Sequence, residues 1–87
     1  MISKNEIKQL RFLHSKKVRE EKQVFIVEGD EMVTEAIQSP LEVLQVYYCS
    51  SSSGAFLDRG MLITEKEMKQ ISQLSSASPS LAVVQRD

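Results

Sequence analysis

The stretch HSKKVREEKQVFIVEGDEMVTEA, residues 14–36, decides how this chain folds. Its lysine- and arginine-rich start leads directly into the apolar block of residues 24–27, which is followed by a turn at Glu28-Gly29. A short β-branched and aromatic block bounded by charge is typical of a central strand whose two faces are both covered. Apolar residues then recur at helical spacing within residues 32–37. The stretch therefore predicts a basic loop, a buried strand, a turn and a helix that packs back on the strand.

Further elements are predicted on both sides of this stretch. Residues 3–6 and 64–67 each have the capping-box form, in which a serine or threonine and a glutamate satisfy free backbone N–H groups at the start of a helix. The helix that starts near residue 64 is expected to turn Met68, Ile71 and Leu74 toward the core. Apolar and alternating runs predict three more strands, at residues 43–49, 61–63 and 81–84.

The order of these elements predicts the fold class. It reads helix, strand, helix, strand, strand, helix, strand, which is typical of an α/β protein. We expect a three-layer α/β/α sandwich with a four-stranded, mostly parallel sheet. With 87 residues, the chain is expected to form one domain, residues 1–87, around a single modest core.

The composition argues against several classes of protein. A hydrophobic share of 41% and a charged share of 26% are those of an ordinary soluble domain. No apolar run approaches the roughly 20 residues that a membrane span requires, and charged residues interrupt positions 1–15, where a signal peptide would be apolar. We therefore expect a cytoplasmic protein that contacts no membrane. Cys49 is the only cysteine, which excludes an internal disulfide and a thiolate metal cluster.

Residues suited to catalysis or metal binding are scarce. His14 is the only histidine, and we expect it to serve the C-terminal end of the first helix, with a phosphate contact as the alternative. The sequence has neither a glycine-rich phosphate loop nor a G-x-S-x-G elbow. Helix capping and the helix dipole explain the acidic residues within 28–35 better than a metal does. We therefore assign no catalytic residue and no metal ligand.

Charge is distributed unevenly along the chain. Residues 1–22 hold seven basic and three acidic side chains, whereas the remaining residues hold four basic and nine acidic ones. A basic end joined to an acidic body predicts a local anionic partner. We expect these cations to lie along the path of a phosphate backbone, with a solvated charged face as the simpler alternative. The candidate contacts to such a backbone are Lys16, Lys17 and Arg19, followed by Lys4, Lys8, Arg11 and Lys22.

Three other residues are candidates for supporting roles. Glu28, at the end of the buried strand, is expected to anchor Arg19 or the local loop backbone, and Gly29 completes the same turn. Phe12 falls outside the apolar stripe of the first helix. It is therefore either an edge contact beside the core or an exposed ring on which a base stacks.

The segment LHSKKVREEKQVFIVEGDEMVTEAI, residues 13–37, resembles the start of the SpoU/TrmH-type RNA 2'-O-ribose methyltransferases. Their N-terminal substrate-binding domain has a leucine, a basic pair and an arginine, then a phenylalanine-containing strand that ends in Glu-Gly, then a helix with Glu-Ala. The later segments LITEKEMKQIS and SPSLAVVQ are similar to the last helix and closing strand of that domain. The matching residues in the first segment are Leu13, Lys16, Lys17, Arg19, Phe25, Val27, Glu28, Gly29, Val33, Glu35 and Ala36.

The resemblance implies a fold, a partner and a reaction. Family members fold this domain like the small ribosomal proteins that recognise kinked RNA. A following knotted domain binds S-adenosylmethionine and usually dimerises. The chain is therefore expected to recognise structured rRNA or tRNA for 2'-O-methylation, without a cofactor of its own and without catalysis as an isolated domain. Its expected partners are RNA and the C-terminal catalytic domain of the same parent, which is expected to be a homodimer.

Two other functions stay open at this point. The first is a stand-alone RNA-binding protein of the ribosomal-protein kind. The second is a protein-interaction module, in which the basic face is only solvated.

Overall fold

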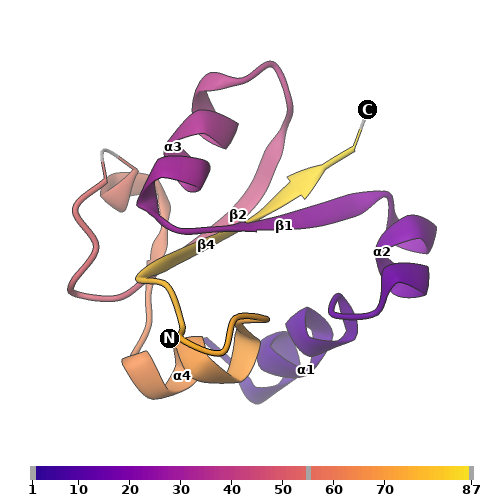
Figure 1. The fold of residues 1–87 in the computed structure, drawn as a ribbon, viewed down its shortest axis with the longest axis horizontal. Coiled ribbons are helices and arrows are strands. Elements are labelled where there is room, and N and C mark those ends of the chain that lie inside the picture. Colours follow the sequence, from indigo (N-terminus) through magenta and orange to yellow (C-terminus); the bar gives the residue numbers. More distant parts are fainter. Residues whose placement is uncertain (1, 55, 87) are drawn as a thin grey trace.

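Four β-strands and four α-helices are found in residues 2–54 and 56–86, the part of the chain that the computed structural model describes (Figure 1). A short 3-10 helix, η1 (Leu57–Arg59), precedes the third strand. In chain order the elements are α1 (Lys4–Phe12), α2 (Lys16–Lys22), β1 (Val24–Glu28), α3 (Asp30–Gln38), β2 (Val43–Tyr48), β3 (Met61–Leu62), α4 (Glu65–Ile71) and β4 (Ser80–Gln85).

The sheet is mostly antiparallel, so the expectation of a mostly parallel sheet is wrong. The strand order is β1-β4-β2-β3, and β4 runs antiparallel to both of its neighbours, whereas β2 and β3 are parallel. β1, β2 and β3 therefore share one direction, as alternation of strands and helices predicts. β4 lies between β1 and β2 in the opposite direction. This one strand makes two of the three ladders in the described sheet antiparallel.

β4 rather than β1 is the buried centre of the sheet, so the prediction that residues 24–27 form a central strand is wrong. β1 pairs with β4 on one side and forms an edge. Within β1 only Val24 is buried, whereas the first five residues of β4 are all buried. The apolar runs at 24–27 and 81–84 look equivalent in the sequence, because a short run does not reveal which strand lies in the middle.

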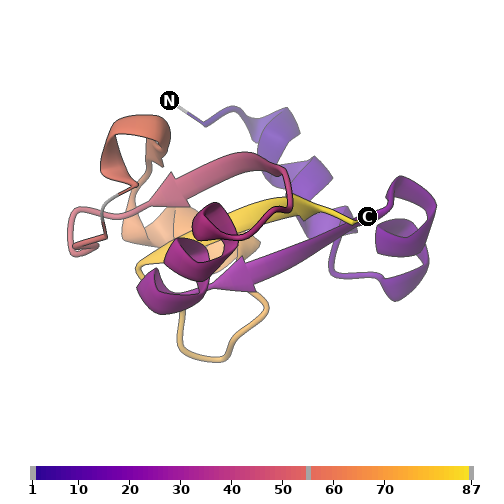
Figure 2. The same cartoon turned by 90° about the horizontal axis from the view of Figure 1, so that it is seen from above.

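Helices cover both faces of the sheet. Figures 1 and 2 show α3 on one face, with α1 and α4 on the other. The core under α3 contains Val33, Phe56 and Ala82, and the core toward α1 and α4 contains Leu10 and Met68. One apolar face of the sheet is thus buried by the helix between β1 and β2, and the other by the first helix and the helix between β3 and β4.

Both predicted capping boxes are present. The Ser3 hydroxyl accepts from the Glu6 N–H at 3.0 Å, and the Ser3 N–H donates to the Glu6 carboxylate at 3.3 Å. Thr64 and Glu67 make the same two bonds at 3.0 and 2.9 Å. These hydrogen bonds confirm both predictions. The sequence could predict them because the partners lie only three residues apart. α4 ends before Leu74, which is 53% exposed, so the expected inward position of Leu74 is wrong.

Residues 16–22 form a helix, so the basic loop predicted there is wrong. α2 ends with Gln23 in the left-handed conformation, at φ 56° and ψ 45°. Val18 is half-buried and packs against the core on the α1 side of the sheet. A single valine among charges of both signs is too weak a periodic signal to predict a helix.

Candidate nucleic-acid interface

One side of α1 carries three of the candidate RNA contacts. Lys4, Lys8 and Arg11 recur every three or four residues and are exposed, because the apolar stripe of the helix faces the sheet. They line a shallow depression together with Ile7 and Phe12, and we call it the α1 groove. Lys8 Nζ lies 6.0 Å from the centroid of the Phe12 ring. The α1 groove is therefore basic and contains one aromatic ring.

Two further candidates lie at the start of α2. Lys16 and Lys17 are exposed, and they follow α1 across the turn of residues 13–15. Lys16 Nζ lies 4.0 Å from the Glu20 carboxylate, at positions that are 81% and 52% exposed. An exposed pair of this kind contributes at most about 1 kcal/mol. Glu20 therefore does not prevent Lys16 from contacting a phosphate.

Arg19 has a structural role that the sequence does not reveal. Its Nη1 donates to the Leu13 carbonyl oxygen at 2.7 Å, and its side chain is half-buried. This bond joins α2 to the end of α1 and so fixes how the two helices meet. A guanidinium has five N–H donors, so others remain for an anion.

The candidate cations are divided between two flanks of α1. Lys22 lines a second groove, between α1 and β2, together with Asn5, Gln9 and Leu44. At 100° per residue, Asn5 and Gln9 lie roughly 90° to 130° around α1 from the centre of its basic side. The structure therefore separates Lys22 from the α1 groove and does not bring all seven cations onto one surface.

Glu28 and Gly29 support the loop between α4 and β4. The Glu28 carboxylate accepts from the Ser72 hydroxyl at 2.5 Å and from the Gln73 N–H at 2.9 Å. Gly29, at φ 100°, donates its N–H to the Ser80 carbonyl at 2.9 Å. This backbone conformation favours glycine. These bonds to residues far along the chain replace the expected contact of Glu28 with Arg19 or its own loop.

Asp30 organises the same end of the sheet. The N-cap of α3 is Gly29, so capping is not the role of Asp30. Its carboxylate accepts from the hydroxyls of Ser52 and Ser80 at 2.7 and 2.6 Å, and from the Ser53 N–H at 3.0 Å. Burial acts to raise the pKa of Asp30, but these hydrogen bonds outweigh it and hold the pKa below its ordinary value. The charged carboxylate therefore joins three separate segments.

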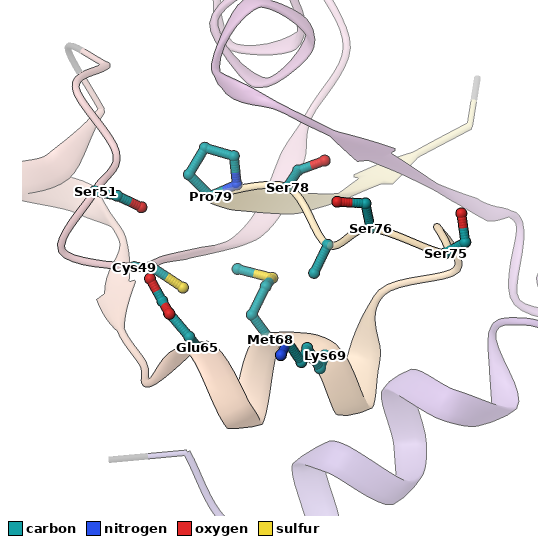
Figure 3. Close-up of a pocket in the computed structure, with 10 residues that line it drawn as sticks. Cys49, Ser51, Glu65, Met68, Lys69, Ser75, Ser76, Ser78 and Pro79 are labelled. Atoms are coloured by element: carbon teal, nitrogen blue, oxygen red, sulfur yellow. The ribbon is translucent and has the colours of Figure 1, made fainter.

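A cavity of about 470 Å³ lies beside the loop that Glu28 supports (Figure 3). Cys49, Lys69 and residues 75–79 are among those that line it. Burial raises the pKa of Cys49, with a further contribution from the charges of Glu65 and Glu67. The thiol is therefore protonated at neutral pH and is a poor nucleophile.

His14 lies where the first helix meets α4. Its Nε2 is 2.8 Å from the Ile71 carbonyl oxygen, so this nitrogen carries the proton and donates it. The ring thus has a structural role at the junction of α1 and α4. No group of three or more His, Cys, Asp or Glu side chains within residues 2–54 and 56–86 is arranged to hold a metal ion. In the same residues, no helix has the length and apolar character that crossing a membrane would require.

Sequence reasoning missed the serines that bind these carboxylates. Ser52, Ser72 and Ser80 are buried, and each donates its hydroxyl to a carboxylate. In the sequence they belong to polar runs that have the pattern of flexible loops. Their partners lie 22, 44 and 50 residues away, so no local pattern links them. The signal that remains in the sequence is an acidic turn after β1, with serines after β2, after α4 and at the start of β4.

The chain was compared with known protein families and structures. A family model described as the MRM3-like substrate binding domain matches residues 4–82. No curated protein sequence matches. The fold is similar to that of an RNA 2'-O ribose methyltransferase, with a TM-score of 0.79 and 20% identity over 98% of this chain. It is also similar to a TrmH-family protein of Porphyromonas gingivalis described as a candidate RNA methyltransferase, with a TM-score of 0.77 and 28% identity over 98% of this chain.

A third similar structure is an rRNA methyltransferase from Sinorhizobium meliloti that was solved with AdoMet bound, with a TM-score of 0.76 and 19% identity over 100% of this chain. The chain spans 36% of the length of each of these three structures. The match of the family model covers nearly all of the described residues, and the similar structures agree with it in fold. The chain therefore belongs to the MRM3-like substrate-binding domains, the substrate-binding domain of the SpoU/TrmH family of RNA 2'-O-ribose methyltransferases.

Proposed function

We propose that this chain is the RNA-recognition domain of an RNA 2'-O-ribose methyltransferase. In this role it positions structured rRNA or tRNA so that a following domain transfers a methyl group to a ribose 2'-hydroxyl. Family membership supports the substrate-binding role. The observation that carries the proposal is a run of exposed cations on two consecutive helices: Lys4, Lys8, Arg11, Lys16 and Lys17.

These cations hold the RNA by its phosphates. Lys16 and Lys17 are the principal contacts, and the basic side of α1 extends the surface. Arg19 positions α2 through its bond to Leu13 and offers its remaining donors to the same backbone. Lys22, on the other flank of α1, contacts RNA only where the RNA wraps around the helix. Contacts of this kind fix the register of the RNA without reading its bases.

S-adenosylmethionine is proposed to bind the following domain. Methyl donation is the chemistry that it supplies there. The residues of the present chain do not fit the cofactor, since its three glycines, at positions 29, 54 and 60, lie on separate turns and form no glycine-rich loop. We therefore assign no catalytic step to this chain, and we propose that the isolated domain transfers no methyl group.

The salt dependence of RNA binding tests this function. The logarithm of the binding constant for a folded RNA is expected to fall with the logarithm of salt concentration by about 0.7 to 0.9 per phosphate neutralised. The double change Lys16→Ala and Lys17→Ala removes two of these contacts and should flatten the slope by roughly 1.4 to 1.8. Fluorescence anisotropy of a labelled RNA hairpin between low and moderate salt measures the slope.

The matched control removes two exposed cations elsewhere, Arg59→Ala and Lys66→Ala, which lie on η1 and α4. It should leave the slope as it is in the unmodified protein. A slope that the first pair leaves unchanged, or that both pairs flatten equally, would contradict the proposed site. No binding at the lowest salt would reject RNA recognition and favour a protein-interaction module.

A further inference from the structure

The α1 groove contains a feature that phosphate binding does not use, the ring of Phe12. The side chain is 47% exposed, although the same helix has an apolar stripe facing the sheet. Lys8 Nζ, at 6.0 Å from the ring centroid, lies at the distance of a cation–π contact. A large aromatic side chain is thus presented to solvent inside a basic depression.

The charge around this ring is of one sign. The residues that line the α1 groove include three cations and no carboxylate. Within residues 2–54 and 56–86 the ion pair joins Lys16 to Glu20, so no described carboxylate lies within 4.0 Å of the charged groups of the groove. Cations that have no acidic partner attract a polyanion. The α1 groove therefore suits a negatively charged ligand better than an apolar one.

The dimensions of the groove suit a short length of single strand. Lys4 and Arg11 are seven residues apart, which is about 10 Å along the helix axis. Only a few nucleotides of a strand can lie along a path of this length. An exposed ring within such a cationic path is how proteins bind single-stranded nucleic acid, because every base has a face that stacks on an aromatic side chain. The bases of a paired helix are stacked on each other and do not offer that face.

We propose that Phe12 stacks on an unpaired base of the bound RNA while Lys4, Lys8 and Arg11 hold the flanking phosphates. The inference rests on the proposed function and narrows its substrate class. The RNA is then a structured molecule that presents a looped or bulged nucleotide to α1. Lys8 covers the Phe12 ring in the free protein and turns to a phosphate when the base arrives.

The test measures affinity for single-stranded hexa-adenylate and for inorganic polyphosphate at low salt, with Phe12 intact and with Phe12→Leu. Leucine keeps the apolar bulk and removes the aromatic face. Loss of one stacked base should weaken hexa-adenylate binding on the order of tenfold. Polyphosphate, which has charge but no bases, should bind both proteins equally. Leu62→Ala, at a β3 position that is 56% exposed, is the control and should change neither affinity.

The outcomes separate the inference from the function on which it rests. Equal binding of hexa-adenylate by the unmodified protein and by Phe12→Leu overturns stacking. A salt slope that Lys16→Ala and Lys17→Ala flatten would then still support RNA recognition. An equal loss of polyphosphate binding shows that Phe12→Leu perturbs the cations, which also overturns stacking. No hexa-adenylate binding by the protein with Phe12 intact overturns the inference as well.

A spectroscopic measurement gives independent evidence. The chain has no tryptophan, so Phe12→Trp introduces a single fluorophore in the groove. A base that stacks on this ring should quench its fluorescence when hexa-adenylate is added, whereas polyphosphate should not. Leu62→Trp is the matched control, and its fluorescence should not respond to hexa-adenylate. Equal quenching at both positions, or none at position 12, overturns the inference.

Discussion

At the scale of single residues, Arg19 has two kinds of partner within reach. One of its N–H groups donates to the Leu13 carbonyl inside the protein, and a guanidinium has four more that can donate to an anion. A lysine keeps the positive charge but has no planar fork of donors. The change Arg19→Lys therefore separates the bond to Leu13 from the contribution of the positive charge to RNA binding.

We expect Arg19→Lys to lower the free energy of unfolding by about 1 kcal/mol, because one partly buried hydrogen bond is lost. The charge remains, so the salt slope of RNA binding should not change. Urea unfolding and anisotropy titrations measure the two quantities. Lys17→Arg is the control at an exposed position and should change stability by no more than about 0.5 kcal/mol. A slope that flattens in Arg19→Lys would contradict this expectation, because it would show that the phosphate contact needs the planar fork of donors and not the positive charge alone.

What the sequence reveals about individual residues depends on how far away their partners lie. The capping pairs at residues 3–6 and 64–67 could be predicted, because each pair is complete within four residues. The serine partners of Glu28 and Asp30 could not, since only the folded sheet brings them together. Lys22 was chosen as a candidate RNA contact from its charge and its place beside the other basic residues, and neither says on which flank of α1 its side chain lies. The structure places Lys22 apart from the α1 groove, which the sequence could not predict.

At the scale of elements, three segments meet where β1 and β2 end and β4 begins. The ladders place Glu28 opposite Leu81 and Tyr48 opposite Ser80, so the following turns converge at that end. Asp30 joins them as an ionised carboxylate, and its pKa lies below the ordinary value in the folded protein. Folding then favours the charged form. This contribution to stability is complete at pH values well above the pKa of the unfolded chain and is lost as the pH falls through that of the folded protein.

Asp30→Asn should therefore destabilise the protein at pH 7 by roughly 1.5 to 3 kcal/mol, the contribution typical of hydrogen bonds to a charged group. The gap between the two proteins should narrow as the pH falls below about 4, because the carboxyl of the unfolded chain then takes up a proton, and it should close further as the carboxyl of the folded protein does the same at lower pH. Urea unfolding at a series of pH values measures the gap. Asp58→Asn, at an exposed position, is the control. A gap that is the same at pH 3 and pH 7 would contradict this account of Asp30.

The elements themselves differ in how well the sequence predicts them. α1, α3 and α4 were predicted because each begins at a recognisable signal and has apolar residues at helical spacing. α2 was missed because tertiary contact of one valine, and not a stripe, holds it in place. The strands were found, but their order was not, since apolar runs of equal length gave no sign that the last one lies in the middle.

At the scale of the whole molecule, we expect stability to depend on β4 more than on any other strand of the described sheet. It forms ladders with both β1 and β2, and its side chains enter the cores on both faces. A chain of this length unfolds with a total free energy of about 5 to 15 kcal/mol. A cavity at one buried position of β4 would therefore remove a large share of this free energy of unfolding.

Leu81→Ala is expected to cost about 2 to 5 kcal/mol, because the side chain is fully buried and a cavity remains. Leu62→Ala, on the exposed surface of β3, should change the stability by no more than about 0.5 kcal/mol. Thermal and urea unfolding of the two variants measure the difference. Equal losses of stability in the two variants would contradict the expectation that stability depends most on β4.

The position of β4 also has a consequence for synthesis. The ribosome makes the strands in chain order, so β1 and β2 emerge before the strand that separates them in the finished sheet exists. Until residues 80–85 leave the exit tunnel, the nascent polypeptide carries unpaired strand edges and uncovered apolar side chains, which are the features that promote aggregation. Folding of this domain is thus held back until its last strand is translated, and until then the growing polypeptide is a substrate for chaperones that shield apolar segments.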